Sequence, residues 1–237
     1  MRFALMTEPQ QGLSYDEILA IARTAEEAGL EAFFRSDHYA SFPGGSGKPT
    51  TDAWTTLAGL ARETSTIRLG VLVSPVTFRI PGSFAKVIQT VDEMSGGRVE
   101  AGFGAGWNAD EHAQLGIPFP DIRERYDMLT EQMAIIHGLW TEPDGWSYEG
   151  KYWKVRGAIR HGEIARGGRP HPHILFGGKG GPRMAALVAE YGDEFNLNSA
   201  SPEDAPKAYA RIRAACRERG GSSRAGRLPD WWSAVRP

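Results

Sequence analysis

Residues 66–107, TIRLGVLVSPVTFRIPGSFAKVIQTVDEMSGGRVEAGFGAGW, decide the fold of this chain. Residues 66–75 are rich in β-branched and apolar side chains, which predicts a buried strand. Residues 98–107 predict a second strand of the same kind. Between them, Pro81 can open a helix whose apolar residues recur at helical spacing: Phe84, Val87, Ile88, Val91 and Met94. A strand, a helix and a strand in this order are typical of a parallel βαβ unit.

The same alternation continues on both sides of this unit. Ser14 and Glu17 form a capping-box pattern at the start of one helix, and Asp52 can cap the next. A last helix is predicted with Pro202 at its first position. Further strands are predicted at 2–6, 31–36, 173–178 and 193–198, and a further helix at 182–191. Six parallel strands are therefore expected in the core.

A closed (β/α) barrel explains this pattern better than an open dinucleotide-binding sheet. The first strand-to-helix turn, TEPQQGLS, contains only Gly12, whereas a dinucleotide-binding turn needs three glycines. Polar residues also recur where predicted strands end, as the mouth of a barrel requires. We expect an α/β fold of the (β/α)8 TIM-barrel type that lacks the last two strands.

The predicted domain covers residues 1–220, and residues 221–237 form an atypical tail. Inside the domain, a segment from about 108 to 172 interrupts the alternation. It contains a predicted long helix at 121–140 and two strand-like pieces, WSYEG and KYWKV, around Gly150. We expect these two pieces to form a β-hairpin over the barrel mouth.

Composition narrows the class of protein. The chain has 237 residues, 41% of them hydrophobic, and a formal net charge of -2. This balance provides no basic surface for nucleic acid and no polybasic membrane segment. Cys216 is the single cysteine, the first ten residues do not resemble a signal peptide, and no window approaches eighteen apolar residues. A cytoplasmic protein that binds neither nucleic acid nor membrane is expected.

The stretch FFRSDHY, residues 33–39, places titratable groups where a buried strand ends. His38 could exchange a proton at the barrel mouth or donate to a ring nitrogen of a cofactor, and Asp37 could orient it. The alternative is that Asp37 caps a loop turn and His38 is an ordinary surface residue. The sequence leaves both open.

Two other strand ends carry candidate binding residues. In GFGAGWNADE (102–111), alternating glycines allow a planar ring or a backbone to approach, and Asn108 and Glu111 can form hydrogen bonds. In FGGKGGPRM (176–184), four glycines precede a helix start at Pro182, a pattern that favours phosphate binding. Lys179 and Arg183 add positive charge there. The histidines show no recurring ligand spacing, so no metal site is expected.

Together these motifs resemble the bacterial luciferase-like monooxygenase superfamily, and within it the branch that depends on the deazaflavin coenzyme F420. The resemblance rests on SDHY, on the stretch from RLGVLVSP to GWNADEH, on WSYEGKYW and on ILFGGKGGPRM. It implies that His38 and Asp37 lie beside the cofactor ring. It also implies a non-proline cis peptide at Leu72–Val73, just before Ser74. The other cofactor-binding residues that it implies are Gly106, Trp107, Asn108, Glu111, Gly177, Gly178, Lys179, Gly180 and Gly181.

The resemblance predicts an F420-dependent oxidoreductase that transfers hydride to or from a small organic substrate. One alternative is an FMN-dependent monooxygenase that uses oxygen. Another is a non-catalytic, truncated paralogue that acts as a partner subunit, since the seventh and eighth strands of the family have no counterpart here. A homodimer is the assembly expected from the sequence.

Overall fold

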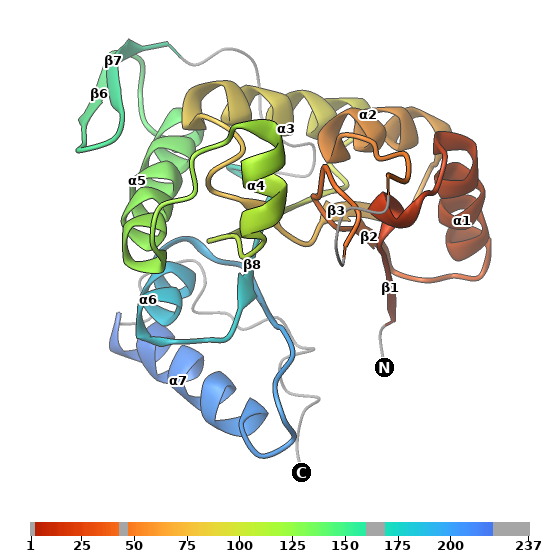
Figure 1. Cartoon of the computed structure of the whole chain (residues 1–237). Coiled ribbons are helices and arrows are strands. Elements are labelled where there is room, and N and C mark those ends of the chain that lie inside the picture. Colours follow the sequence, from red (N-terminus) through yellow and green to blue (C-terminus); the bar gives the residue numbers. More distant parts are fainter. Residues whose placement is uncertain (1–2, 43–46, 160–168, 220–237) are drawn as a thin grey trace.

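The computed structural model describes residues 3–42, 47–159 and 169–219. Its main sheet follows the strand order β1-β2-β3-β5-β8-β9, with the short β4 paired to β5, and every pairing is parallel. The strands are β1 (Ala4–Thr7), β2 (Ala32–Arg35), β3 (Arg68–Val71), β4 (Ser74–Pro75), β5 (Val99–Gly104), β8 (His173–Gly178) and β9 (Glu194–Leu197). The sheet curls and its helices lie on the outer side, which makes an open half-barrel (Figure 1). The predicted fold class is confirmed.

The helices begin where the capping residues predict. The capping box of Ser14 and Glu17 is formed at the start of α1 (Tyr15–Glu27), and the Asp52 side chain accepts from the Thr55 amide at the start of α2 (Ala53–Glu63). Three other helices follow strands: α3 (Pro81–Ser95), α6 (Pro182–Tyr191) and α7 (Ala205–Glu218). The prediction that the last helix begins at Pro202 is wrong. The Asp204 amide donates to the Ser201 side chain at 3.1 Å, which holds residues 202–204 in a turn before α7.

The core lies between the sheet and the outer helices. Phe33 of β2, Leu69 of β3 and Phe103 of β5 are fully buried in one cluster with α2 and α3 side chains. Each such side chain contributes about 1.5–3 kcal/mol through the hydrophobic effect. The strand pleat sends Phe34 to the opposite, inner face, where it packs in a small second cluster with Ala32 and Leu175.

The inserted segment contains α4 (Ala109–Leu115), α5 (Ile122–Thr141) and a hairpin of β6 (Trp146–Glu149) and β7 (Lys154–Ala158). The hairpin was predicted to cover the mouth, and that prediction is wrong. It packs against α5, where Glu131 accepts from the backbone amides of Lys151, Tyr152 and Trp153. Figure 1 shows it beyond the end of α5, away from the sheet. The predicted tail, 221–237, lies outside the described residues. Among the described helices, none has the length and apolarity needed to cross a membrane.

Candidate active site

The predicted site residues gather at the carboxyl edge of the sheet. In register, Arg35 lies opposite Val71, Pro75 opposite Gly104, and Gly178 opposite Leu197. Because these strands are parallel, the segments that follow them emerge on the same side. The sheet therefore brings the His38 loop and the glycine turn of residues 177–181 to one rim, as the sequence predicts.

The strand predicted at 66–75 is interrupted in its middle. The peptide bond Leu72–Val73 is cis, so the predicted cis peptide is confirmed. Here the Val73 side chain lies against three glycines of neighbouring strands. A Cβ atom on Gly104 would come within 2.5 Å of Val73 Cγ2, and one on Gly177 within 2.8 Å of Val73 Cγ1. These two glycines are needed because a larger residue would displace the Val73 segment.

His38 is oriented by Glu111, and not by Asp37 as one hypothesis had it. Its Nδ1 lies 2.9 Å from Glu111 Oε2. Glu111 is 1% exposed, and its other carboxylate oxygen accepts from the backbone amides of Tyr39 and Ala40. A carboxylate only accepts hydrogen bonds, so Nδ1 carries the proton and Nε2 is the nitrogen that can meet a ligand.

Two aromatic rings border the His38 imidazole. Its ring centroid lies 4.8 Å from that of Phe42 and 5.5 Å from that of Trp107, both edge to face. Phe42 and Trp107 also contact each other, with their centroids 5.1 Å apart. The Trp107 side chain is exposed and follows Gly106, whose positive φ of 78° turns the chain between β5 and α4.

Asp37 is buried in a different network. Its carboxylate accepts from Ser74 Oγ at 2.6 Å and from the Arg79 guanidinium at 2.5 and 3.2 Å. Arg79 also donates to Asp52 at 2.6 Å and to the Tyr39 hydroxyl at 2.8 Å. Asp37 therefore connects the end of β2 to the segment that follows β3. Both of its carboxylate oxygens are used in these contacts, so its role in this structure is to position that segment.

Asp52 is the clearest example of charge stabilised by this network. Burial opposes its ionisation, but the Thr55 amide, Arg79 and the Tyr39 hydroxyl all favour the carboxylate and lower its pKa to about 2. Burial raises the pKa of Tyr39. Tyr39 is therefore a neutral donor to Asp52, and the acid, the phenol and Arg79 are held in fixed protonation states around neutral pH.

A second histidine, His112, connects α4 to the segment that follows β4. His112 is 1% exposed; its Nδ1–H donates to the Asn108 carbonyl at 2.6 Å, and its Nε2 accepts from the Thr77 hydroxyl at 2.6 Å. Burial lowers the pKa of His112. Asn108 is also the N-cap of α4, since its side chain accepts from the Glu111 amide. Asn108 and Glu111 were predicted to contact the cofactor, yet both are buried and serve to position α4 and His38.

The glycine turn before α6 keeps its predicted form. Gly181 is the N-cap of α6 and has no side-chain cap, while Lys179 is exposed. Gly178 and Gly180 each use their carbonyl, accepting from the Asn198 amide and from Arg211. Arg183 was expected to add charge to this turn. It pairs instead with Asp127 and donates to the Arg123 carbonyl on α5, so of the two predicted cations Lys179 is the one that remains at the turn, where Arg211 also donates to Gly180.

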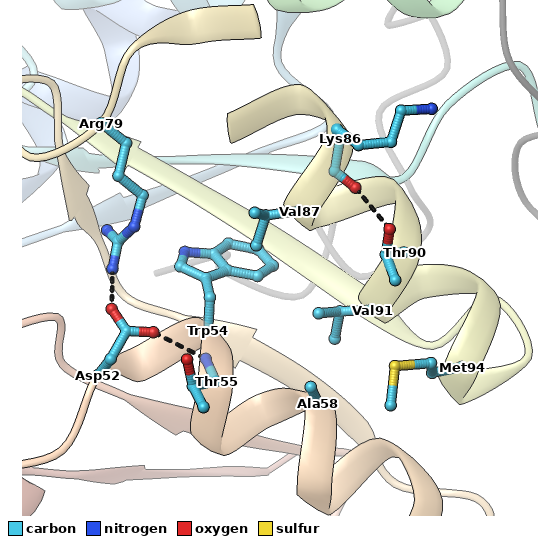
Figure 2. A pocket seen from close by; sticks show the side chains of 10 residues that line it. All are labelled: Asp52, Trp54, Thr55, Ala58, Arg79, Lys86, Val87, Thr90, Val91 and Met94. Carbon is cyan, nitrogen blue, oxygen red and sulfur yellow. Dashed lines mark hydrogen bonds and ion pairs between the residues drawn. The ribbon is translucent and has the colours of Figure 1, made fainter. Parts of the chain in front are cut away.

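A groove elsewhere on the surface is distinct from this site. It lies between α2 and α3 and encloses about 360 Å³. Figure 2 shows Arg79 reaching Asp52 at one end of it, with Met94 at the other. Its lining residues are Asp52, Trp54, Thr55, Ala58, Arg79, Lys86, Val87, Thr90, Val91 and Met94. Asp52 and Arg79 of the Asp37 network line one end of the groove, but His38 and Glu111 do not line it, so it is separate from the His38 rim.

A charged cluster lies at the opposite, amino end of the strands. Glu100, His173 and Glu194 bring one possible ligand atom each within 4.8 Å of one another. Glu100 also pairs with Arg68 at 2.5 Å and with His173. Burial opposes charge on His173, but its contact with Glu100 raises its pKa. Glu100 is thus paired with Arg68 and His173, and the cluster brings together three groups that could ligate a metal.

Sequence reasoning missed three features of the site. Neither Phe42 nor Arg79 was given a partner from the sequence. The helix α4 was not predicted, although Asn108 followed three residues later by Glu111 is an N-terminal pattern and Gly116 marks its end. That signal could have placed Glu111 on a helix beside His38.

Comparisons with known proteins agree with this architecture. A family model described as luciferase-like monooxygenase matches residues 1–229. An F420-dependent glucose-6-phosphate dehydrogenase of Mycolicibacterium gilvum is 31% identical over 217 residues, which is 90% of this chain and 61% of the relative. A relative of the same name from Beutenbergia cavernae is 33% identical over 77% of this chain and 52% of its own length. The chain thus spans about half to three fifths of these curated relatives.

Solved structures share the fold. The monooxygenase RslO1 from Streptomyces bottropensis has a TM-score of 0.78 at 25% identity and covers 93% of this chain and 67% of its own. An F420-dependent secondary alcohol dehydrogenase has a TM-score of 0.80 at 21% identity, a likeness of fold, over 92% of this chain and 64% of that one. The family match also extends past the boundary predicted at residue 220. The chain belongs to the luciferase-like monooxygenase family.

Proposed function

We propose that this chain carries the cofactor site of an F420-dependent oxidoreductase acting on a small organic molecule. The observation that carries the proposal is the contact of His38 Nδ1 with the buried Glu111 carboxylate, 2.9 Å away, at the carboxyl edge of the half-barrel. Curated relatives named as F420-dependent, at 31% and 33% identity, support the choice of cofactor. Because the chain is shorter than those relatives, the activity of a whole enzyme is part of the proposal.

The described residues fit a deazaflavin with a phosphate-bearing tail. The Val73 side chain packs directly on Gly104 and Gly177 at the carboxyl edge of the sheet, and this segment is the one that would back the planar ring. At the turn of residues 177–181, the uncapped start of α6 and the exposed Lys179 suit a phosphate group. When bound, the deazaflavin supplies a carbon that accepts or releases hydride.

The contribution of the protein to the chemistry is proton management by His38. With Nδ1–H donating to Glu111, Nε2 has a free lone pair. That nitrogen can accept a proton from a substrate hydroxyl, and Glu111 then stabilises the resulting imidazolium. The backbone amides of Tyr39 and Ala40 hold the carboxylate in place for both states.

Fluorescence quenching with F420, and with FMN in parallel, tests the proposal. We expect micromolar binding of F420 by the wild-type chain. The Lys179→Ala variant should bind F420 about tenfold more weakly, while Lys86→Ala, an exposed lysine of the α2–α3 groove, should match the wild type.

Three results of this titration would contradict the proposal. Absence of F420 binding would refute it. Tighter binding of FMN, with oxygen consumption by the reduced complex, would favour the flavin-dependent monooxygenase instead. Binding of neither cofactor, together with a tight complex with a full-length family member, would favour a non-catalytic partner subunit.

A further inference from the structure

The cluster of Glu100, His173 and Glu194 lies on the inner face of the half-barrel. Glu100 of β5 is in register with His173 of β8. Glu194 of β9 is in register with Leu175, two positions further along β8, so its side chain points to the same face as that of His173. That face is the inner one, since Leu175 packs in the inner cluster with Phe34. Three neighbouring strands therefore direct one side chain each to one place, at the end of the sheet opposite the carboxyl edge.

Two atoms of this cluster are buried without a hydrogen bond. Glu100 is 1% exposed, and within the described part of the chain neither its Oε2 nor Nδ1 of His173 has a hydrogen-bond partner. These two atoms contact each other, but not with the geometry of a hydrogen bond. A carboxylate oxygen of Glu194 lies within 4.8 Å of both. Because buried polar atoms are normally satisfied, the pair needs an explanation, and an ion between the two lone pairs would provide one.

The other carboxylate oxygen of Glu100 is already held by a hydrogen bond. Arg68 donates to Glu100 Oε1 at 2.5 Å and to Glu31 at 2.7 Å. Carboxylates that ligate metals are themselves usually oriented by a hydrogen bond from a neighbouring group. Arg68 therefore directs Oε2 towards His173, and neither of its contacts has to break when an ion binds.

We propose that Glu100, His173 and Glu194 bind one divalent transition-metal ion, with Zn²⁺ as the best match. Zinc accepts imidazole together with carboxylates, whereas calcium and magnesium sites are built from oxygen ligands. Atoms that share a tetrahedral zinc ion lie about 3.5 Å apart, so the three groups need to close by ~1 Å, which side-chain rotation allows. His173 and Glu194 are partly exposed, which leaves a path for the ion and for a water as fourth ligand.

The role of this ion is structural. It joins β5, β8 and β9 at the end of the sheet opposite His38, so it stabilises the half-barrel without reaching the cofactor site. Because the ligands come from three different strands, no spacing along the chain could indicate the site. The expectation of no metal rested on that spacing. The inference does not depend on the proposed function.

Calorimetry on the full chain, stripped of metal with a chelator, tests the proposal with Zn²⁺ as the probe. We expect one ion per chain at micromolar affinity or tighter, and a higher urea midpoint of unfolding when Zn²⁺ is added. Glu100→Gln keeps an oxygen for Arg68 but removes the anionic ligand, so it should weaken Zn²⁺ by about tenfold or more, as should His173→Gln. Co²⁺ should show visible absorption bands typical of tetrahedral coordination in the wild type and lose them in both variants. Glu194→Gln, at a partly exposed position, should weaken Zn²⁺ equally and answers the question if a buried variant does not fold.

His171→Gln is the matched control for His173→Gln. His171 lies two positions earlier, its Nδ1 contacts the Pro172 carbonyl, and its ring centroid is 5.3 Å from that of His137, a pair that could take up zinc adventitiously. Zinc binding that His171→Gln abolishes and Glu100→Gln leaves unchanged would overturn the proposal. Absence of zinc binding by the wild type would also overturn it, and Glu100 and His173 would then be a buried ion pair. F420 affinity should be the same within about threefold with chelator or with Zn²⁺, so a chain that binds zinc but not F420 contradicts the proposed function alone.

Discussion

Replacing Glu111 with glutamine is the sharpest test of how this site works. In the wild type, Nδ1–H of His38 donates to Glu111 Oε2 at 2.9 Å, and Oε1 accepts from the Ala40 amide at 3.0 Å. Glutamine keeps one acceptor oxygen for the backbone amides and turns an NH₂ group towards Nδ1. Two donors would then face each other, so the imidazole proton is expected to move to Nε2.

The magnitude follows from the contacts that change. A buried hydrogen bond to a charged group is replaced by a neutral one of opposite direction, which costs about 1–1.5 kcal/mol of unfolding free energy. Nε2 can then no longer accept a proton, so the oxidation rate of a substrate alcohol should fall about 10²–10⁴-fold. F420 affinity should stay within about threefold, because Glu111 is 1% exposed and we therefore expect it not to contact the ligand.

Long-range ¹H–¹⁵N NMR correlations identify which His38 nitrogen carries the proton, with His38→Gln providing the assignment. Urea unfolding gives the stability difference. Asp110→Asn is the control, since Asp110 is the exposed neighbour on α4 and the same chemical change there should have no effect. The reasoning is refuted if Glu111→Gln leaves the proton on Nδ1 and the rate within threefold of the wild type.

Three further outcomes are expected. Gly104→Ala should lower the unfolding free energy by about 1–3 kcal/mol in urea, because the new Cβ would lie 2.5 Å from Val73 Cγ2; an unchanged midpoint would contradict the packing described. The pKa of Asp52 in the folded protein is about 2, below its usual 3.8. Its ionised carboxylate therefore contributes fully to the unfolding free energy above pH 4, and this contribution is lost as the pH falls to 2. Asp52→Asn should remove about 1–2 kcal/mol at pH 7 after allowance for solvent screening, and less at pH 2. F420 affinity should fall with rising salt in the wild type and depend on salt less in Lys179→Ala.

The local parts of the fold could be predicted from the sequence because their signals are local. Apolar runs gave the strands, the Ser14–Glu17 capping box gave a helix start, and Pro81 gave another. The signal for a helix start is ambiguous where a proline follows a serine whose side chain can close a turn instead. Pro202 looks like a helix start, but the Ser201 side chain accepts from the Asp204 amide and delays the helix.

Side-chain partners distant in the sequence could not be predicted in the same way. His38 and Glu111 are 73 positions apart, and nothing in the sequence around either residue indicates that the other is its partner. Asp37 looked like the natural partner of His38 because the two are adjacent. In extended backbone, however, neighbouring side chains point to opposite sides, so adjacency makes a contact between them unfavourable. The hairpin shows the same limit, since its strands were predictable and its packing on α5 was not.

The polar residues 35–38 at the end of β2 can now be understood as four separate connections. Arg35 donates to residues 51 and 56 at the start of α2, and Ser36 to Gln10 in the loop after β1. Asp37 binds the segment after β3, and His38 binds α4 after β5. Each residue ties the strand tip to a different neighbour. Three of the four side chains are almost completely buried, and His38 alone retains a nitrogen that a ligand can reach. The first three connections fix the backbone from which His38 projects, so changes to them should alter its position before they alter its chemistry.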